Sequence, residues 1–279
     1  MTKATDSWEI NVIRTASLSF AILFAFVGLL LPCRVCGQAI LDPALEQAVA
    51  NDKKTSEEAQ KYTYTERKRD LNFDSKGNVK QDSSDTFEII FLEGAPYRKH
   101  TMHNDQPLPG KEQKAEDKKL ADVAKARREH PEKDRPLSGQ FHLKLPVDQI
   151  PARFDVTPAG FDEVDGRKML IFKAVPRPGA AGMKEISRDG LAWDMKLWVD
   201  EQDKVFSRIE AKVIADGMRF ENGLVCEFNW KKVNGEAWLP VRYWIKGKVR
   251  YMGMNVPAEA EQSYSNYQKF HADTKIVVQ

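Results

Sequence analysis

The sequence predicts a mainly β fold organised around an antiparallel meander near the C-terminus, with a few helices beside it. The first observation is alternation: Trp193, Met195 and Leu197 would lie on one face of a strand, and the polar residues between them on the other. Successive side chains of a strand point to opposite faces, so this period of two is typical of a half-buried antiparallel strand. The second observation is the even spacing of turn signals over residues 193–270, among which Asn234-Gly235 is the strongest hairpin signal.

The N-terminal part of the sequence predicts export. Residues 15–31 form one continuous apolar segment, and small residues precede Gln38. These features are typical of a secretory signal peptide, in which residues 1–37 would be removed. The alternative is an uncleaved N-terminal membrane anchor, because the segment is only slightly shorter than a membrane-spanning helix. Residues 38–279 are expected to form a single β domain with a charged helical insertion at about 109–130.

The charge and cysteine content argue against two classes of protein. The full chain has a formal net charge of +2, and removal of residues 1–37 would bring it closer to zero. A nearly neutral chain offers no electrostatic case for binding nucleic acid. Cys226 would be the one cysteine left, so an intramolecular disulfide is not expected. Its position beside Phe228 and Trp230 on an apolar face predicts a buried, inert thiol.

The first element expected after the signal is a helix over about residues 43–60. Asp42 is placed to cap its N-terminus, and Pro43 to occupy its first turn. Three strands are then expected, separated by turns rich in Gly, Asn, Asp and Pro, at residues 62–73, 87–91 and 97–103. The helix at 109–130 has few apolar positions, so it is expected to lie largely in water, either as a connector or as a mobile flap over the sheet.

The second half of the chain is predicted to be almost entirely β. Strand patterns cover residues 141–145, 154–156, 168–175, 193–199, 205–215, 224–231, 239–245 and 259–270. Asp162, Glu163 and Asp165 flank a glycine and are interpreted as turn formers. Residues 176–189 are rich in Gly and Pro and predict a long loop. This loop and the helix at 43–60 are the segments expected to move if the sheet holds a ligand.

No catalytic constellation is found in the sequence. The Gly-x-Ser-x-Gly, Walker and Gly-x-Gly-x-x-Gly motifs are absent, so neither a nucleophile elbow nor a phosphate-binding loop is predicted. His100 and His103 are three residues apart on a predicted strand, where an odd separation sends two side chains to opposite faces. We therefore expect no metal site, no cofactor and no enzymatic activity.

Three phrases near the C-terminus carry a resemblance to a known family. They are Leu197-Trp198-Val199-Asp200 before a turn, Gly235-Glu236-Ala237-Trp238-Leu239-Pro240 in a hairpin, and Tyr264-Ser265-Asn266-Tyr267-Gln268-Lys269-Phe270 at the end. These phrases, and the order of one helix, three strands, an inserted helix and a long meander, resemble the LolA-like superfamily of outer-membrane lipoprotein-sorting proteins and periplasmic lipoprotein carriers. The resemblance implies a curved, half-open antiparallel β-sheet, a half-barrel, whose concave apolar side is covered by helices. This chain departs from the family in its greater length and in the unusual charge of the helix at 109–130.

Together, the resemblance and the alternating apolar faces predict a secreted, non-enzymatic periplasmic carrier. Its partner would be an acyl chain of a lipoprotein or a lipid, and it would act in outer-membrane lipoprotein sorting or lipid transport. The ligand-lining residues are expected at alternating apolar positions of the strands: Phe87, Ile89, Phe91, Leu170, Phe172, Met195, Leu197, Phe228, Trp230, Val241, Tyr243 and Ile245. Which side of the pleat faces the ligand decides this set, because a one-residue shift moves every side chain to the other face. The alternative function is an envelope sensor or scaffold that binds another envelope protein, since the charged helix suits a protein partner better than a lipid.

Overall fold

The computed structural model describes residues 41–74, 76–131, 145, 147–177, 193–216, 221–251 and 254–270. The predicted signal peptide, most of the predicted strand at 141–145 and most of the predicted loop at 176–189 lie outside the described residues. Within the described part of the chain, no helix is long and apolar enough to span a membrane.

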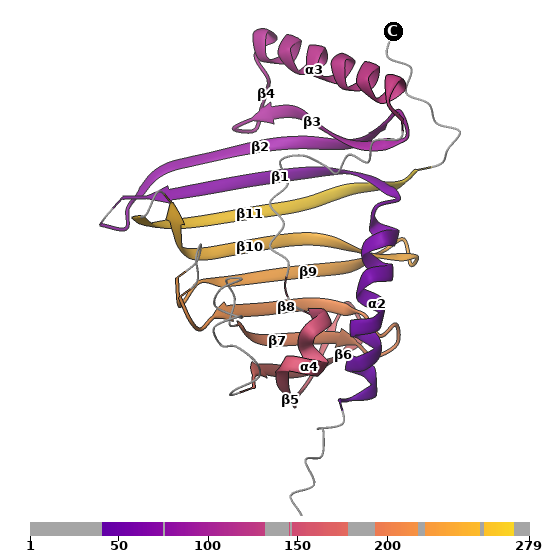
Figure 1. The fold of residues 1–279 in the computed structure, drawn as a ribbon, viewed down its shortest axis with the longest axis vertical. Helices are drawn as coiled ribbons and strands as arrows, with labels where there is room; N and C mark the ends of the chain where they lie inside the picture. Colours follow the sequence, from indigo (N-terminus) through magenta and orange to yellow (C-terminus); the bar gives the residue numbers. More distant parts are fainter. Residues whose placement is uncertain are drawn as a thin grey trace, which may run out of the picture. The chain divides into compact units, whose positions relative to one another are not determined.

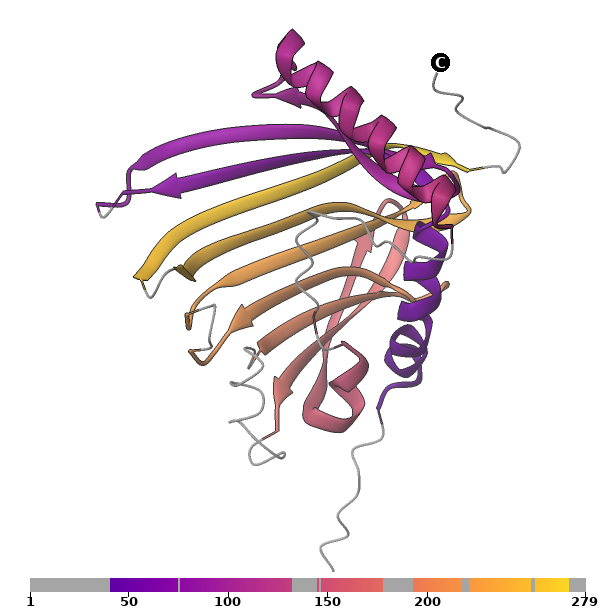
Figure 2. The ribbon, with the colours of Figure 1, turned by 45° about the horizontal axis from the view of Figure 1, so that its top comes forward.

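Eleven strands form one antiparallel sheet in the order β4-β3-β2-β1-β11-β10-β9-β8-β7-β6-β5 (Figure 1). The strands are β1 (Tyr62–Phe73), β2 (Val79–Leu92), β3 (Ala95–His103), β4 (Gln106–Pro107), β5 (Phe154–Val164), β6 (Arg167–Pro176), β7 (Trp193–Asp200), β8 (Phe206–Val213), β9 (Val225–Val233), β10 (Ala237–Tyr251) and β11 (Met254–Lys269). Strands that are neighbours in sequence pair with each other, except β4 and β5, and β1 also pairs with β11. The sheet is curved but not closed, and β4 and β5 form its two edges (Figure 2).

Helix α2 (Pro43–Ala59) lies across one end of the central strands (Figure 1). It begins where the sequence predicts, because the Asp42 carboxylate accepts a hydrogen bond from the Ala44 N–H at 2.8 Å and Pro43 occupies the first turn. Its apolar side is narrow: Ala44, Leu45 and Ala48 are its buried residues. Leu45 and Ala48 pack into the main apolar cluster of the sheet, so α2 covers one face of the meander.

Helix α3 (Gly110–Glu129) packs on the opposite face of the sheet from α2. Its Leu120 and Ala124 pack against Leu92 and Tyr97. Leu92 follows Ile89 by three residues on β2, so the two side chains point to opposite faces, and Ile89 lies on the side of α2. The Arg127 guanidinium donates to the backbone oxygens of Leu92, Ala95 and Pro96, each at 2.8 Å, which fixes the helix to the β2–β3 turn. Most of α3 is exposed, as predicted, and the side that packs on the sheet is the narrow stripe formed by Leu120, Val123 and Ala124 together with Glu116 and Arg127.

Two charged residues lie inside the interface between α3 and the sheet, and their charge made this part of the helix look exposed in the sequence. Glu116 and Arg127 are both only 9% exposed. The Glu116 carboxylate accepts from the Tyr97 hydroxyl at 2.7 Å and from the His100 N–H at 3.3 Å. Burial and this carboxylate raise the pKa of Tyr97 above its ordinary value. Charged residues that look solvated in the sequence thus close the edge of β3, which is a common protection for an exposed strand.

The fold class predicted from the sequence is confirmed, but β2, β5 and β10 are each longer than predicted, since β2 begins at Val79 and β10 ends at Tyr251. The sequence indicated a strand at 154–156 only, whereas β5 continues to Val164. Asp162 and Glu163 belong to this strand, and the turn is formed by Asp165 and Gly166, whose φ angles are +51° and +72°. Because β5 is an edge strand and mostly exposed, its polar residues do not show the alternation of a half-buried strand.

Candidate functional site

The face of the sheet beneath α2, called here the covered face, carries a continuous apolar row. Phe172 on β6 pairs with Leu197 on β7, and Leu197 with Ile209 on β8. Ile209 in turn pairs with Phe228 on β9, and Phe228 with Tyr243 on β10. Directly paired residues of antiparallel strands point to the same side, so these five side chains cross five strands on one face.

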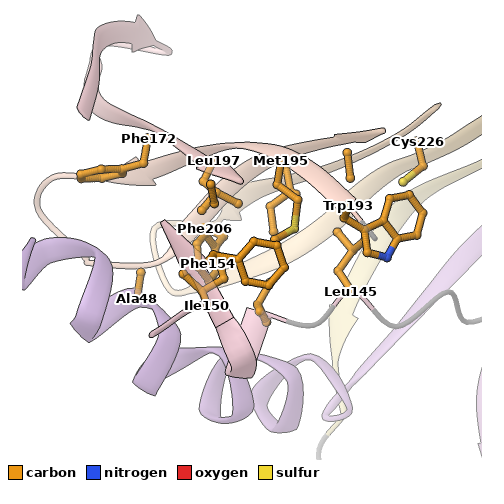
Figure 3. Close-up of a cluster of buried hydrophobic side chains, with 14 of the residues drawn as sticks. Ala48, Leu145, Ile150, Phe154, Phe172, Trp193, Met195, Leu197, Phe206 and Cys226 are labelled. Carbon is orange, nitrogen blue, oxygen red and sulfur yellow. The ribbon is translucent and has the colours of Figure 1, made fainter. Parts of the chain in front are cut away.

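Side chains from several short elements fill the space over this row. Leu45 comes from α2, Val147 from the 3-10 helix η2 (Val147–Gln149), and Ile150 from α4 (Ile150–Arg153). Phe154 at the start of β5 joins them, and Figure 3 shows Ile150 and Phe154 close to Leu197 and Met195. Leu45, Ile150 and Leu197 are each 0% exposed. In this structure the covered face is therefore packed, and these elements form its cover.

Few directional bonds are seen between the cover and the sheet. The Asn51 side chain of α2 donates to the Lys204 backbone oxygen at 2.9 Å. Near α4, the Arg177 N–H donates to the Arg153 oxygen at 2.9 Å, and the Arg177 guanidinium to the Ala152 oxygen at 3.1 Å. The remaining contacts of the cluster are between apolar side chains. Such contacts are not directional, so another apolar chain of suitable shape can replace them.

The structure brings most of the predicted ligand-lining residues to the covered face. Phe172, Met195, Leu197, Tyr243 and Ile245 are buried in the main cluster, and Leu170, Phe228 and Trp230 pack against it partly buried. Phe87, Ile89 and Phe91 lie on the same face of β2. This follows from the register, because Phe87 pairs with Glu66 and Glu66 with Tyr264, which packs against the main cluster.

Val241 is the predicted lining residue that does not lie on the covered face. The β9–β10 register shifts between Pro240 and Arg242, and such a bulge breaks the alternation of side chains. Val241 lines a pocket of about 540 Å³ together with Trp198, Trp238 and other residues of the opposite face. A bulge of this kind leaves no signal in the alternation pattern, so the sequence could not separate Val241 from Tyr243.

The covered face carries polar side chains from β11 onward. Tyr243 pairs with Gln262, and Gln262 with Lys68 on β1. Beside them, Glu66 is 0% exposed and forms an ion pair with Arg98 at 2.8 Å. Burial and the Glu66 charge raise the pKa of Tyr264, whose hydroxyl donates to the Gln262 side-chain oxygen at 3.0 Å. The apolar row from Phe172 therefore ends at Tyr243 on β10, and a buried polar cluster adjoins it.

Trp193 is a residue of the covered face that the predicted set of lining residues omitted. It is 0% exposed and lies beside Leu145 and Cys226 (Figure 3). Within the described part of the chain, its indole N–H has no hydrogen-bond acceptor. An unsatisfied buried donor costs about 1–3 kcal/mol, so the position needs a physical explanation. The sequence carried the signal, because Trp193 has the same alternation as Met195 and Leu197.

Cys226 is buried on this face, as the alternation predicts. Burial raises the pKa of its thiol to about 12. A thiol with so high a pKa stays protonated at neutral pH and is a poor nucleophile. Cys226 therefore contributes packing to the covered face.

The pocket on the opposite face has apolar walls and charged groups that are already paired. Arg167 forms two hydrogen bonds of 2.7 Å with Asp200 and one of 2.9 Å with Asp203. The Asp203 carboxylate also accepts from Lys232 and from the Trp238 indole N–H, both at 2.8 Å. Burial opposes ionisation of Asp203, but these donors outweigh it and hold the pKa of Asp203 below its ordinary value. This network joins β6, the β7–β8 turn, β9 and β10.

His100 and His103 lie close together, contrary to the expectation from their spacing. His100 Nε2 is 3.0 Å and His103 Nδ1 is 2.8 Å from the same Asp85 oxygen. The register of β2 with β3 shifts between Thr86 and Phe87, and this bulge cancels the odd separation. Among the described residues, no group of three His, Cys, Asp or Glu side chains has a geometry that could hold a metal ion.

Comparison with known proteins gave structural likenesses only. No family model matches the sequence, and no curated protein matches it. Among solved structures, the chain is similar to a domain from Vibrio parahaemolyticus that is provisionally described as an outer membrane lipoprotein-sorting protein domain. The two share 9% identity, with a TM-score of 0.35 over 83% of this chain and 95% of that one.

Two further solved structures are similar to the same degree. One is a DUF1329 family protein from Desulfovibrio piger, with 13% identity and a TM-score of 0.33 over 83% of this chain and 93% of that one. The other is a LolA superfamily protein from Nitrosomonas europaea, with 10% identity and a TM-score of 0.32 over 85% and 96% of the two chains. The superfamily that the closing sequence phrases resemble is thus named among these structures. Because the identities and TM-scores are low, the likenesses carry no argument about function.

Proposed function

We propose that this protein is a non-enzymatic periplasmic carrier that binds an acyl chain of a lipoprotein or a lipid on the covered face of its sheet. Its role would be outer-membrane lipoprotein sorting or lipid transport. The observation that supports this most is the apolar row from Phe172 to Tyr243, which crosses five strands beneath a cover attached mainly by apolar contacts. An acyl chain offers the same kind of contact as Leu45 and Ile150, so it can take their place.

The free energy gained by burying a long acyl chain favours its exchange for the side chains of the cover. Burial of a methylene group contributes about 0.8 kcal/mol, so about fifteen of them contribute about 12 kcal/mol. Exposing Leu45 and Ile150 would cost about 1.5–3 kcal/mol each. The gain from a long acyl chain therefore exceeds the cost of lifting these two side chains of the cover, whereas a chain of a few carbons would not displace them.

Native mass spectrometry of protein purified from cells tests this function, together with displacement of a fluorescent fatty-acid probe. We expect a co-purifying lipid, or probe binding that a long-chain lipid displaces and a short-chain one does not. Trp238→Phe is the matched control, because Trp238 lies on the opposite face and its substitution should leave probe binding unchanged. Absence of both a bound lipid and probe binding would overturn the proposal.

A second candidate function, an envelope sensor or scaffold, is favoured by the outer surface of α3. This helix is held on the sheet by Glu116, Leu120, Ala124 and Arg127, and its other side carries many exposed lysine and glutamate side chains. In-cell cross-linking from the exposed position Lys118, with exposed Lys212 on β8 as control, tests it. A partner protein captured from Lys118 alone would support this function, and equal or no capture from the two positions would contradict it.

A further inference from the structure

The indole N–H of Trp193, which lacks a hydrogen-bond acceptor among the described residues, indicates which part of an acyl ligand the covered face recognises. Trp193 begins β7 and is 0% exposed, and its indole N–H has no acceptor within the described part of the chain. In Figure 3 the indole nitrogen lies on the side of the ring away from Cys226 and close to Leu145, toward the cover. The donor is therefore directed into the space that an incoming ligand would use.

Among the described residues, the surroundings of this donor offer no protein acceptor and no site for a water molecule. Trp193 pairs with Val213, and Leu145, Leu224 and Cys226 belong to the same buried cluster. A buried water needs two to four polar partners, and these apolar side chains supply none. Buried N–H groups are nearly always paired in native proteins, so an unpaired one in a candidate binding site indicates an acceptor that arrives with the ligand.

We propose that Trp193 donates a hydrogen bond to the carbonyl oxygen of an acyl ester or acyl amide, so that the protein distinguishes acylated ligands from plain hydrocarbon chains. This inference rests on the proposed function. The direction of β7 then orients the ligand: with the carbonyl at Trp193, the tail follows Met195, Leu197 and Val199. These residues span about 20 Å of extended strand, which suits a long acyl chain.

A pair of ligands that differ in one carbonyl group tests the inference. The full chain is titrated with monopalmitoyl glycerol, an ester, and with hexadecyl glycerol, the ether of equal chain length that lacks the carbonyl. We expect the wild-type protein to bind the ester about twofold to tenfold more tightly, which is the range for one hydrogen bond. Trp193→Phe keeps an aromatic ring without the donor, so its affinity for the ester should fall to that for the ether. The ether affinity should not change.

Two controls keep the result interpretable. Trp238→Phe also removes an indole donor, but one that bonds to Asp203 on the opposite face, so it should preserve the preference for the ester. If Trp193→Phe fails to fold, the wild-type protein labelled with ¹⁵N in its indole groups gives an independent measurement. The Trp193 indole proton resonance should move downfield with the ester and stay in place with the ether.

Equal binding of ester and ether by the wild-type protein would overturn the role of Trp193 while leaving acyl binding intact. An equal loss of both ligands in Trp193→Phe, with no shift of the indole proton resonance, would do the same. Failure of the wild-type protein to bind either ligand would overturn the proposed function itself, and this inference with it.

Discussion

Asn51 in α2 donates a hydrogen bond to the backbone oxygen of Lys204, 2.9 Å away in the turn between β7 and β8. The two residues are far apart in sequence, and this bond joins the cover of the apolar face to the sheet. It is a directional contact in an interface made mainly of apolar side chains. Its removal should therefore loosen the cover without creating a cavity beneath it.

Asn51→Ala should make the covered face easier to open. We expect the free energy of unfolding to fall by about 0.5–1.5 kcal/mol, the usual range for one hydrogen bond. The affinity for a long-chain acyl probe should rise severalfold, because less free energy is needed to populate the open state. Urea unfolding and probe titration measure the two effects. Gln47→Ala, at an exposed position of the same helix, is the control. Lower stability without higher affinity would mean that α2 is not the element the ligand displaces.

Asp203→Asn should destabilise the protein in a pH-dependent way. Asp203 accepts from Arg167, Lys232 and Trp238, and its side chain is 24% exposed. Its pKa in the folded protein is below the ordinary value, so its contribution to stability is present above pH 4 and is lost as the pH falls through the folded pKa. We expect a loss of about 2–4 kcal/mol at pH 7 and a smaller one near pH 3.

Urea unfolding of wild-type and Asp203→Asn protein at the two pH values checks this. Glu163→Gln, at an exposed position of β5, should have little effect at either pH. A loss for Asp203→Asn that is the same at pH 7 and pH 3 would show that its charge does not matter.

Gly247→Ala should damage the covered face by direct contact. A Cβ atom at Gly247 would lie 2.7 Å from both Cα and Cβ of Leu224, so the backbone of the neighbouring residue would have to move. We expect a loss of about 1–3 kcal/mol, as for other overpacked positions. Gly110→Ala is the matched control, because nothing lies within 4 Å of the added Cβ at the start of α3. Thermal unfolding measures both, and equal midpoints for the two variants would contradict the close approach seen in the structure.

The sequence predicted the sheet well because alternation reports burial on one face directly. The pattern of Trp193, Met195 and Leu197 on β7 and the Asn234-Gly235 turn needed no knowledge of distant contacts. The residues that the sequence misjudged depend on such contacts. Glu116 and Arg127 of α3 look solvated until the backbone of the β2–β3 turn is placed beside them.

In the candidate site too, the sequence predicted the features that follow the strand period and missed those that depend on distant contacts. Most of the predicted lining residues reach the covered face because they follow the strand period. Val241 and the pair His100 and His103 were misplaced because β-bulges shift the register, and a bulge has no signature in apolar periodicity. The sequence did predict the α2 part of the cover, but not the part formed by Ile150 and Phe154, because these residues stand in short segments whose packing depends on the finished sheet.

Hydrogen exchange of α2 with and without a long-chain acyl ligand tests whether the cover opens to admit an acyl chain while the sheet stays intact. Amides of α2 should therefore exchange faster than those of β7 and β8 in the free protein, and their exchange rates should change when the ligand binds. The amides of β7 and β8 should remain protected throughout. Protection of α2 as strong as that of β7 and β8, unchanged by the ligand, would mean that the covered face is a permanently filled core and that the protein is not a carrier.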